Sequence, residues 1–403
     1  MFPMNSTARL ASVVLLMALT ACSPAGQPPQ SPPAPTTSAD VSVTPILAAP
    51  VAIPIPVPMT DGRTHLAYEL LLTNASDQDL TVDSLEVLSD NHTLLGLKGP
   101  QLAYWTRPMG SHEAGTKLGA GQVAKVWLDV PIDAGSPVPQ HLSHRLVVNV
   151  GRPMPPLVPA VVTENVAEMN VSDRRPVVIS PPLRGPNWLD ANSCCDMTPH
   201  RMALNPIAGA LWGAERFAID YLQIADGGRI FTGNKDLPQS YPYFGADIHA
   251  VADGPVVSVL DGLPEQVPGH TPTGLTLAQY GGNHVVQDIG GGNYAFYAHL
   301  QTGSVQVKPG DRLTTGQVLG KLGNSGNSDA PHLHFHVMST PDPLRSDGLP
   351  FVFKAFDLTG RLASSAAEDA LEAGQPAQLQ PGVATRNETD VSPLFLDVMN
   401  YAR

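Results

Sequence analysis

The stretch Pro331-His332-Leu333-His334-Phe335-His336-Val337 carries the strongest signal for both fold and chemistry in this chain. Residues two apart in a β-strand project from the same face, so the three histidines share one face while Leu333, Phe335 and Val337 face the core. A neutral imidazole is a common zinc ligand, and two histidines on one strand can serve one metal site. A solvated polar face is the alternative, but three histidines at this spacing favour a functional site.

Further stretches upstream of this strand support the same interpretation. They combine glycine-rich turns with short apolar runs, and one of them carries another histidine motif. They are Ala250-Val251-Ala252-Asp253-Gly254-Pro255-Val256-Val257, Gly281-Gly282-Asn283-His284-Val285-Val286, Tyr297-Ala298-His299-Leu300, Val307-Lys308-Pro309-Gly310-Asp311, Gly316-Gln317-Val318-Leu319-Gly320 and Gly323-Asn324-Ser325-Gly326-Asn327-Ser328. Each stretch alone is a weak signal, but their order and spacing are specific.

Together these motifs resemble the lysostaphin/LytM-type zinc endopeptidases, which cut peptidoglycan cross-bridges and stem peptides. The resemblance covers roughly residues 205–340 and implies a mostly antiparallel β-sheet with a groove for the peptide. It implies zinc as the cofactor, with His334, the second histidine of the H-x-H motif, as a ligand. It also implies that His332 and His299 flank the reacting water, transfer protons and stabilise the developing oxyanion.

The remaining ligands of such enzymes come from an earlier H-x-x-x-D motif, and here the sequence departs from the pattern. Either Tyr243-Phe244-Gly245-Ala246-Asp247 or Arg216-Phe217-Ala218-Ile219-Asp220 can fill this slot. We favour the second, because residues 245–250 already begin the strand that follows the motif, so that residues 221–244 become an insertion. Asp220 is then the carboxylate ligand, and Arg216 stands in place of the histidine. Arginine has no lone pair to offer a metal.

Three protein ligands are usual for a catalytic zinc, so another residue has to complete the site. His200, in Pro199-His200-Arg201 just before the domain, is the best substitute. The resemblance supports this choice, because relatives of this two-domain type have a similar histidine there. His249 and Tyr243 are weaker candidates. His336 shares the face of His334 but lies beside it, at a position where ordinary members have Glu or Gln.

Two functions are compatible with these motifs. The first is a zinc-dependent endopeptidase that hydrolyses peptide bonds of peptidoglycan, and it is our prediction, because a dead site has no chemical need for Asp220, His299, His332 and His334 together. The alternative is a catalytically inactive domain of the same type that binds the cell wall or activates a cell-wall amidase. Arg216 favours this alternative.

An apolar run near the N-terminus predicts export. Residues 10–21, LASVVLLMALTA, follow a single cation and are too short to span a bilayer. They end in Leu19-Thr20-Ala21-Cys22, which resembles the lipobox of bacterial lipoproteins and implies that residues 1–22 are a signal and that Cys22 is lipidated. Residues 23–50, rich in Pro, Ser and Thr, predict a tether. We expect an extracytoplasmic, membrane-anchored protein, with the outer membrane facing the periplasm as the favoured location.

The rest of the chain predicts a mainly β protein. Residues 51–175 read as a sandwich of immunoglobulin-like type, because Leu66, Tyr68, Leu70 and Leu72 alternate with other residues and further strands follow over 123–130 and 146–150. This domain is expected to be a spacer or a binding module. Residues 176–204 are predicted as a connector, residues 205–355 as the peptidase domain, and residues 356–403 as an irregular or weakly helical tail.

Composition limits the partners of the protein. The formal net charge of −13 argues against nucleic acid, because phosphate binding needs a basic surface. The 36 Gly and 41 Pro favour short strands and turns over long helices. Cys194 and Cys195 are adjacent; a bond between them, a bond to another chain, and free thiols all stay open, and a role as metal ligands is disfavoured.

Overall fold

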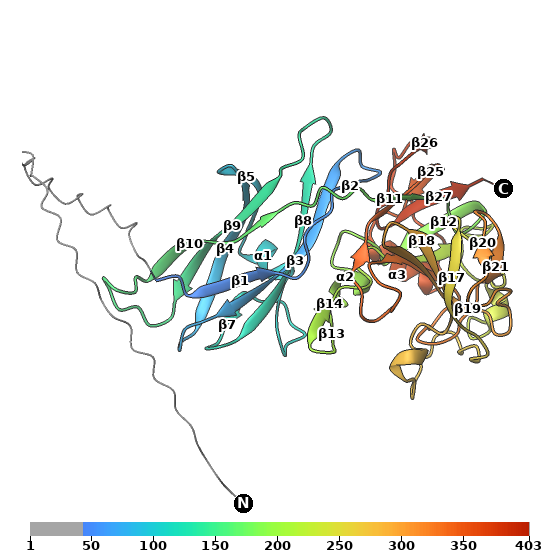
Figure 1. Ribbon diagram of the computed structural model, residues 1–403, viewed down its shortest axis with the longest axis horizontal. Helices are drawn as coiled ribbons and strands as arrows, with labels where there is room; N and C mark the ends of the chain where they lie inside the picture. The colour runs from blue at the N-terminus through green and yellow to red at the C-terminus, as the bar shows by residue number, and fades with distance from the viewer. Residues whose placement is uncertain (1–42, 403) are drawn as a thin grey trace, which may run out of the picture. The chain divides into compact units, whose positions relative to one another are not determined.

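The computed structural model describes residues 43–402, which belong to one compact unit. The predicted signal, Cys22 and residues 23–42 of the predicted tether lie outside the described residues. The described chain is built mainly of β-strands, with three short α-helices, so the predicted mainly β fold class is confirmed (Figure 1). No helix in the described part of the chain is long and apolar enough to cross a bilayer.

Residues 46–170 form two antiparallel sheets around one apolar cluster. One sheet has the order β1-β3-β8-β6 with β2 beside β3, and the other has the order β10-β9-β4-β5 with β7 beside β4. The strands are β1 Ile46–Pro50, β2 Val57–Pro58, β3 Thr64–Asn74, β4 Leu80–Ser89, β5 His92–Lys98, β6 Thr106–Pro108, β7 Lys117–Leu118, β8 Val123–Ile132, β9 His141–Val150 and β10 Val161–Asn170, and helix α1 is Pro100–Tyr104. The predicted immunoglobulin-like topology stays a prediction.

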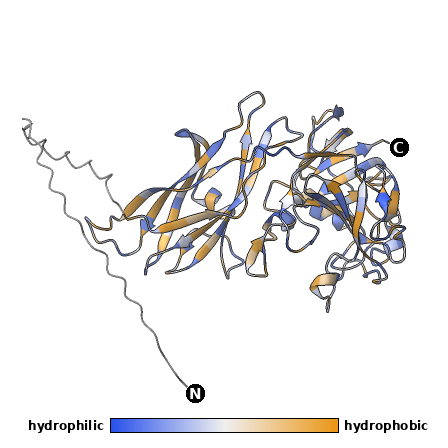
Figure 2. Ribbon diagram, in the orientation of Figure 1, coloured by the Kyte–Doolittle hydropathy of each residue, from blue (hydrophilic) through white to orange (hydrophobic). Residues whose placement is uncertain are grey.

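Alternation of side chains explains why these strands form a sandwich. Leu66, Tyr68, Leu70 and Leu72 of β3 are at most 1% exposed, so the period of two in the sequence corresponds to one buried face. Figure 2 shows hydrophobic and hydrophilic residues along the strands of this part. Strand β1 pairs with β3 from Ile46 onward, so the prediction that the tether extends to residue 50 was wrong at its end.

A second, larger sheet carries the histidine strand. Its order is β20-β17-β18-β19-β22-β15-β12-β27-β25-β26, with β23 beside β22, and its neighbouring strands are antiparallel. The strands are β12 Gly185–Ala191, β15 Ile219–Gln223, β17 Gly254–Leu260, β18 Asn283–Gly290, β19 Asn293–Leu300, β20 Arg312–Leu313, β22 Leu333–Met338, β23 Gly348–Leu349, β25 Phe356–Arg361, β26 Arg386–Glu388 and β27 Asp397–Tyr401.

The smaller elements complete this part of the chain. Paired short strands are β11 Val177–Ile179 with β24 Phe351–Phe353, β13 Asn205–Ile207 with β14 Ala210–Trp212, and β16 Asp247–His249 with β21 Val318–Lys321. The helices are α2 Pro199–Met202, α3 Ser365–Glu372 and the single 3-10 turns η1 Pro238–Ser240 and η2 Leu277–Gln279. Cys194 and Cys195 are joined to each other by a disulfide, which selects one of the three states left open above.

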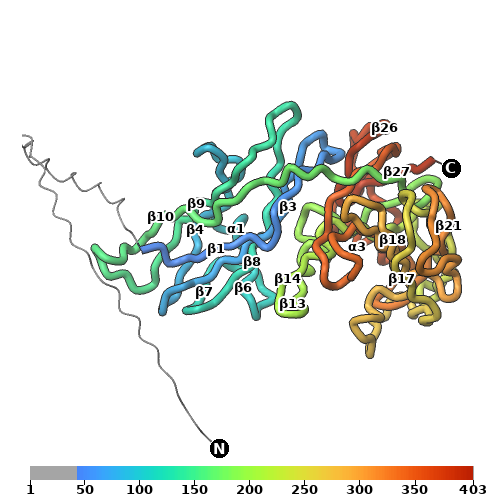
Figure 3. Tube along the Cα trace, in the orientation of Figure 1, coloured from blue at the N-terminus to red at the C-terminus, as the bar shows by residue number. Residues whose placement is uncertain are grey.

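Two segments that were predicted to lie outside the peptidase domain, residues 176–204 and 356–403, contribute strands to this sheet. The predicted connector contributes β12, and the predicted tail contributes β25, β26, β27 and helix α3. In Figure 3 the red C-terminal segment lies beside a green part of the chain, and there β27 pairs with β12. The prediction of an irregular or weakly helical tail missed these strands. They are short, β27 gains hydrogen bonds from β12 far upstream, and β25 and β26 join the sheet through β27, which local composition does not reveal.

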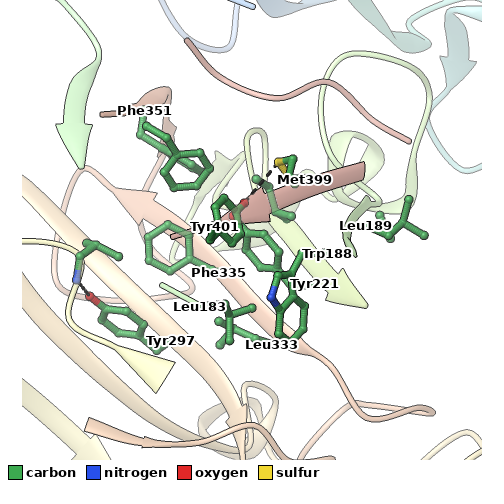
Figure 4. Close-up of a cluster of buried hydrophobic side chains, with 14 of the residues drawn as sticks. Leu183, Trp188, Leu189, Tyr221, Tyr297, Leu333, Phe335, Phe351, Met399 and Tyr401 are labelled. Atoms are coloured by element: carbon green, nitrogen blue, oxygen red, sulfur yellow. Dashed lines mark hydrogen bonds between the residues drawn. The ribbon is translucent and has the colours of Figure 1, made fainter. Parts of the chain in front are cut away.

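One face of the large sheet packs on an apolar core. Leu333, Phe335 and Val337 of β22 are completely buried in it, as the alternation in the histidine strand predicted. Figure 4 shows Phe335 close to Tyr221 and Tyr401 in this cluster. The histidines of the same strand are therefore fixed on the opposite face by the burial of their neighbours.

Candidate metal centre and its cavity

Strand pairing sets the centre of the site. Asp220 of β15 lies directly opposite His334 of β22 in the antiparallel register, and Ala298 of β19 lies opposite His334 on the other side. The Asp220 Oδ1 atom is 2.9 Å from Nδ1 of His334. The register with Asp220, which we favoured from the sequence, is therefore the one that the structure brings to the histidine strand.

His200 enters the site from helix α2. Its Nε2 atom lies 3.2 Å from Oδ2 of Asp220, and its ring packs edge-on against His334 at 4.7 Å between centroids. Thr198 caps the helix by accepting a hydrogen bond from the backbone of Arg201, which fixes the short turn that carries His200. One oxygen or nitrogen each of His200, Asp220 and His334 lies within 4.8 Å of the others.

His299 and His332 lie on the other side of His334. Their rings are 4.7 Å apart between centroids, and ligand atoms of His299, His332 and His334 also lie within 4.8 Å of one another. The Nε2 atom of His332 is 3.3 Å from Oδ1 of Asp220. His299 has a φ of +60°, a left-handed conformation that is uncommon outside glycine and that redirects the side chain at the end of β19.

Hydrogen bonds on the far side of each ring orient the imidazoles. Nδ1 of His200 faces the Ala218 carbonyl at 3.2 Å, Nδ1 of His299 faces that of Ser325 at 2.8 Å, and Nδ1 of His332 faces that of Ala330 at 2.8 Å. Carbonyl oxygens only accept, so each of these Nδ1 atoms carries a proton and each Nε2 atom points to the shared centre. His334 is reversed: its Nδ1 faces Asp220 and its Nε2 faces His336.

Charge is concentrated around Asp220. Burial by itself raises the pKa of the Asp220 carboxyl, but His200 and His332 outweigh burial and hold the pKa well below its usual range. Burial lowers the pKa of His200, yet the Asp220 carboxylate raises it to about 9. Burial, reinforced by His332 and His334, lowers the pKa of His299 well below its ordinary value. A dication held by Nε2 of His200 would therefore have to displace a proton from this ring.

This donor set fits zinc. Two imidazoles and one carboxylate are a usual set of protein ligands for a catalytic zinc, which keeps its fourth position for water or substrate. His200, Asp220 and His334 supply that set, and each imidazole is oriented by an acceptor behind it, as metal-binding histidines usually are. Asn192 adds a hydrogen bond of 2.9 Å from its amide to Oδ2 of Asp220.

A cavity of about 590 Å³ opens over these residues. Leu277 of η2 and Tyr280, which directly follows this turn, line the cavity and are 63% and 44% exposed, so they offer apolar contact to a ligand. Glu215, Asp220, Asp329 and Asp342 are its acidic lining residues, and no Lys or Arg lines it among the described residues. The arrangement can therefore hold an extended ligand across a metal centre.

The weaker candidates lie elsewhere. Tyr243 is buried in the apolar core, and Nδ1 of His249 faces the Gly316 carbonyl at 2.9 Å; neither residue lines the cavity. Asp247, from the register that we did not favour, is exposed and pairs with Lys321. Arg216 does not line the cavity either, and its guanidinium binds Glu69.

Several residues of the site were not predicted from the sequence. Asn192 and Glu215 fall in stretches that carry no recognisable motif, and Ser325 acts through its backbone carbonyl. Only the glycine-rich turn around Ser325 gave a signal, because such turns bring backbone groups close to other side chains.

Comparison with known proteins places the motifs in a family. Residues 241–346 match the model of peptidase family M23. This range contains His299, His332 and His334 but neither His200 nor Asp220. Two candidate ligands therefore come from outside the part of the chain that the family model covers.

Two curated relatives illustrate the likeness. The glycyl-glycine endopeptidase ALE-1 of Staphylococcus capitis is 34% identical over 116 residues, which are 28% of this chain and 30% of the relative. The peptidoglycan DD-endopeptidase ShyA of Vibrio cholerae is 30% identical over 105 residues, which are 26% and 22%. The chain thus spans less than a third of the length of these relatives.

Solved structures show a weaker likeness. The catalytic domain of lysostaphin from Staphylococcus simulans is 19% identical, with a TM-score of 0.23 over 40% of this chain and 88% of that one. The catalytic domain of the M23 protein EnpA from Enterococcus faecalis is also 19% identical, with a TM-score of 0.26 over 42% and 93%. At these scores the likeness carries no further argument.

Proposed function

Because residues 241–346 form a peptidase family M23 domain, we propose that the protein is a zinc-dependent endopeptidase that hydrolyses peptide bonds of peptidoglycan. The observation that carries the proposal is the convergence of His200, Asp220 and His334, with ligand atoms within 4.8 Å, under a cavity lined by two further histidines. The relatives named as endopeptidases support the substrate class.

His200, Asp220 and His334 are the residues that would hold the metal. The chemistry that zinc supplies at such a site is polarisation of a carbonyl and activation of water near neutral pH. His299 and His332 flank this position and each presents an Nε2 atom toward it, because their Nδ1 atoms are bound to carbonyls. They are placed to take a proton from the attacking water, to deliver one to the leaving amine and to stabilise the oxyanion.

The lining of the cavity offers apolar contact to a peptide. Leu277 and Tyr280 offer an apolar edge to a chain that crosses the metal centre. His299 and His332 are only 6% and 9% exposed, so water reaches the reacting bond only through the cavity. We therefore assign the scissile bond to an amide of a wall peptide, whose leaving group is an amine.

Zinc content is the first test. Residues 23–403, which contain the whole compact unit, are purified and their zinc is counted by elemental analysis; we expect about one ion per chain. His334→Ala and His200→Ala should each lose the ion, whereas His249→Ala, which changes a histidine outside the cavity, should keep it. A native chain without zinc would refute the peptidase.

Cleavage is the second test. Muropeptides with a D,D cross-link and peptides with a Gly-Gly bridge are digested and the products are identified by mass spectrometry. His332→Ala should keep zinc and lose roughly 100-fold or more in turnover. A zinc-loaded chain that cuts neither class, but raises the activity of a cell-wall amidase, would instead establish the non-catalytic alternative.

We also propose that a lipid on Cys22 holds the peptidase at a membrane outside the cytoplasm, with the outer membrane favoured. The support is the stretch Leu19-Thr20-Ala21-Cys22 after an apolar run. Fractionation of cells that express the native chain or Cys22→Ser tests this, because only the native chain should sediment with outer membranes and incorporate labelled palmitate. An equal distribution of the two chains would exclude the anchor.

A further inference from the structure

Arg216, the residue that replaces a ligand in the family pattern, binds a buried glutamate of the N-terminal sandwich. Its Nη2 atom donates to Oε2 of Glu69 at 2.7 Å, and its Nε atom donates to Oε1 at 3.0 Å. Glu69 lies on β3 and is 0% exposed, and Arg216 is 4% exposed. Paired, nearly parallel bonds of this kind are geometrically specific and strong where water is excluded.

The same carboxylate faces a second arginine. Nη1 of Arg201 lies 3.8 Å from Oε1 of Glu69, and Arg201 is 1% exposed. Its Nη2 atom donates to the Leu128 carbonyl at 3.2 Å, and its own carbonyl accepts from the Trp127 indole at 2.6 Å. Strands β3 and β8 of the sandwich thus hold Arg201 at three points.

Both arginines adjoin candidate metal ligands. Arg201 directly follows His200, and Arg216 precedes Asp220 by four residues. Helix α2 has only four residues, too few to be stable without external contacts. The Nδ1 atom of His200 also donates a hydrogen bond to the carbonyl of Ala218, which lies between Arg216 and Asp220 in the sequence. This bond links helix α2 to the segment that carries Asp220.

We propose that Glu69 is a positioning residue of the metal centre, and that the N-terminal sandwich is a working part of the site rather than a spacer. By binding Arg201 and Arg216 together, Glu69 fixes the two segments that deliver His200 and Asp220 from outside the stretch that matches the family. This inference rests on the proposed function, since it assumes that the centre takes zinc. Arg216 is then no sign of an inactive site, because its ion pair with Glu69 fixes the segment whose Ala218 carbonyl orients His200, the substitute ligand.

Zinc affinity tests the proposal. Residues 23–403 of the native chain and of Glu69→Gln are titrated against a chelator of known affinity, at a temperature where circular dichroism shows both folded. Glutamine keeps the shape of Glu69 but removes the one carboxylate charge that faces both arginines, so we expect zinc affinity to fall by about tenfold or more. The absorption spectrum of the Co²⁺-substituted protein should also weaken, as His200 and Asp220 lose their fixed placement.

Glu164→Gln is the matched control. Glu164 is another buried glutamate of the sandwich, 3% exposed, and it accepts a hydrogen bond from the backbone of Ile46. We expect its substitution to leave zinc affinity and the Co²⁺ spectrum unchanged, whatever it does to the melting temperature. If Glu69→Gln lowers only the melting temperature, with native affinity and spectrum, the positioning role is overturned.

A second variant covers failure to fold. Arg201→Lys keeps a cation but loses the planar group that contacts both Glu69 and Leu128, and it should lower zinc affinity in the same direction. Native affinity in this variant would overturn the proposal. Zinc loading of the native chain is measured first: its absence would reject the proposed function itself, whereas loading that is insensitive to Glu69 and Arg201 would reject only this inference.

Discussion

The Nε2 atom of His334 lies 2.8 Å from Nδ1 of His336. Nδ1 of His334 faces Asp220, so a metal bound through this atom would require the ring proton of His334 on Nε2, from which it can be donated to His336. His336 is 1% exposed, and among the described residues its own Nε2 atom has no hydrogen-bond partner. The imidazole of His336 is therefore placed to accept this proton and to favour the tautomer in which His334 can bind a metal.

We predict that His336→Leu lowers zinc affinity by about 10- to 100-fold, because His334 loses the acceptor that orients it. His336→Gln should retain most of the affinity, since its amide oxygen can still accept the proton. Chelator competition measures both variants. Equal affinity in the leucine variant and the native chain would show that the contact does not support the site.

The loop that holds His299 gives a second prediction. Gly326 has a φ of +74°, and a Cβ atom there would lie 2.2 Å from the backbone nitrogen of Gly282. The neighbouring Ser325 carbonyl accepts from Nδ1 of His299. Gly326→Ala should therefore push this turn away, cost about 1–3 kcal/mol of unfolding free energy and reduce turnover through His299.

Gly303→Ala is the matched comparison. Gly303 also has a positive φ, +70°, but a Cβ atom there would meet nothing within 4 Å. It should cost about 1–2 kcal/mol in urea unfolding from backbone strain alone and leave kcat unchanged. If both substitutions change turnover to the same extent, the packing of Gly326 against Gly282 has no special role.

A third prediction concerns acid stability. His144 is 0% exposed, lies 2.7 Å through Nε2 from the Tyr68 hydroxyl, and burial lowers its pKa to about 4. It is neutral in the folded protein but titrates near 6.5 when unfolded. Its contribution is thus complete above pH 6.5 and is lost as pH falls toward 4, by on the order of 3 kcal/mol.

His144→Gln should flatten this dependence, because glutamine does not titrate. Urea unfolding of both chains at pH 7.5, 6 and 5 gives the measurement, and the difference between the chains should shrink as pH falls. His65 works in the opposite direction, since its carboxylate partners outweigh burial and raise its pKa, but it is common to both chains and cancels. A constant difference across this range would contradict the assignment.

The alternation of apolar residues predicted which faces of the strands are buried. The alternation at Leu66, Tyr68, Leu70 and Leu72, and again at Leu333, Phe335 and Val337, corresponds to buried faces of real strands. A period of two is a property of the strand itself, so it can be read without knowing any partner. The same reasoning identified the histidine face of β22.

Contacts between residues far apart in the sequence could not be predicted in this way. Strand β27 joins the large sheet through β12, and the ion pair of Glu69 with Arg216 spans 147 positions. Neither Glu69 nor strand β27 carries a motif, and composition over residues 361–390 suggested an irregular or weakly helical tail. His200 was accessible only as a hypothesis about a missing ligand; the structure places it 3.2 Å from Asp220, and its binding of zinc stays a prediction.

The last prediction concerns the charge of the substrate. Glu215 and Asp329 line the cavity and form no ion pair among the described residues, whereas Asp342 pairs with Arg345 at 2.6 Å. A peptide with an ammonium group near the scissile bond should therefore be cut faster than its acetylated copy, by roughly two- to fivefold per carboxylate at low salt. Measurement of kcat/KM for the two peptides at 20 and 300 mM salt checks this, since screening should reduce the preference.

Glu215→Gln with Asp329→Asn should abolish the preference while zinc content stays native, because neither residue belongs to the donor set. Equal rates for the two peptides at low salt would mean that the acidic lining does not select the substrate.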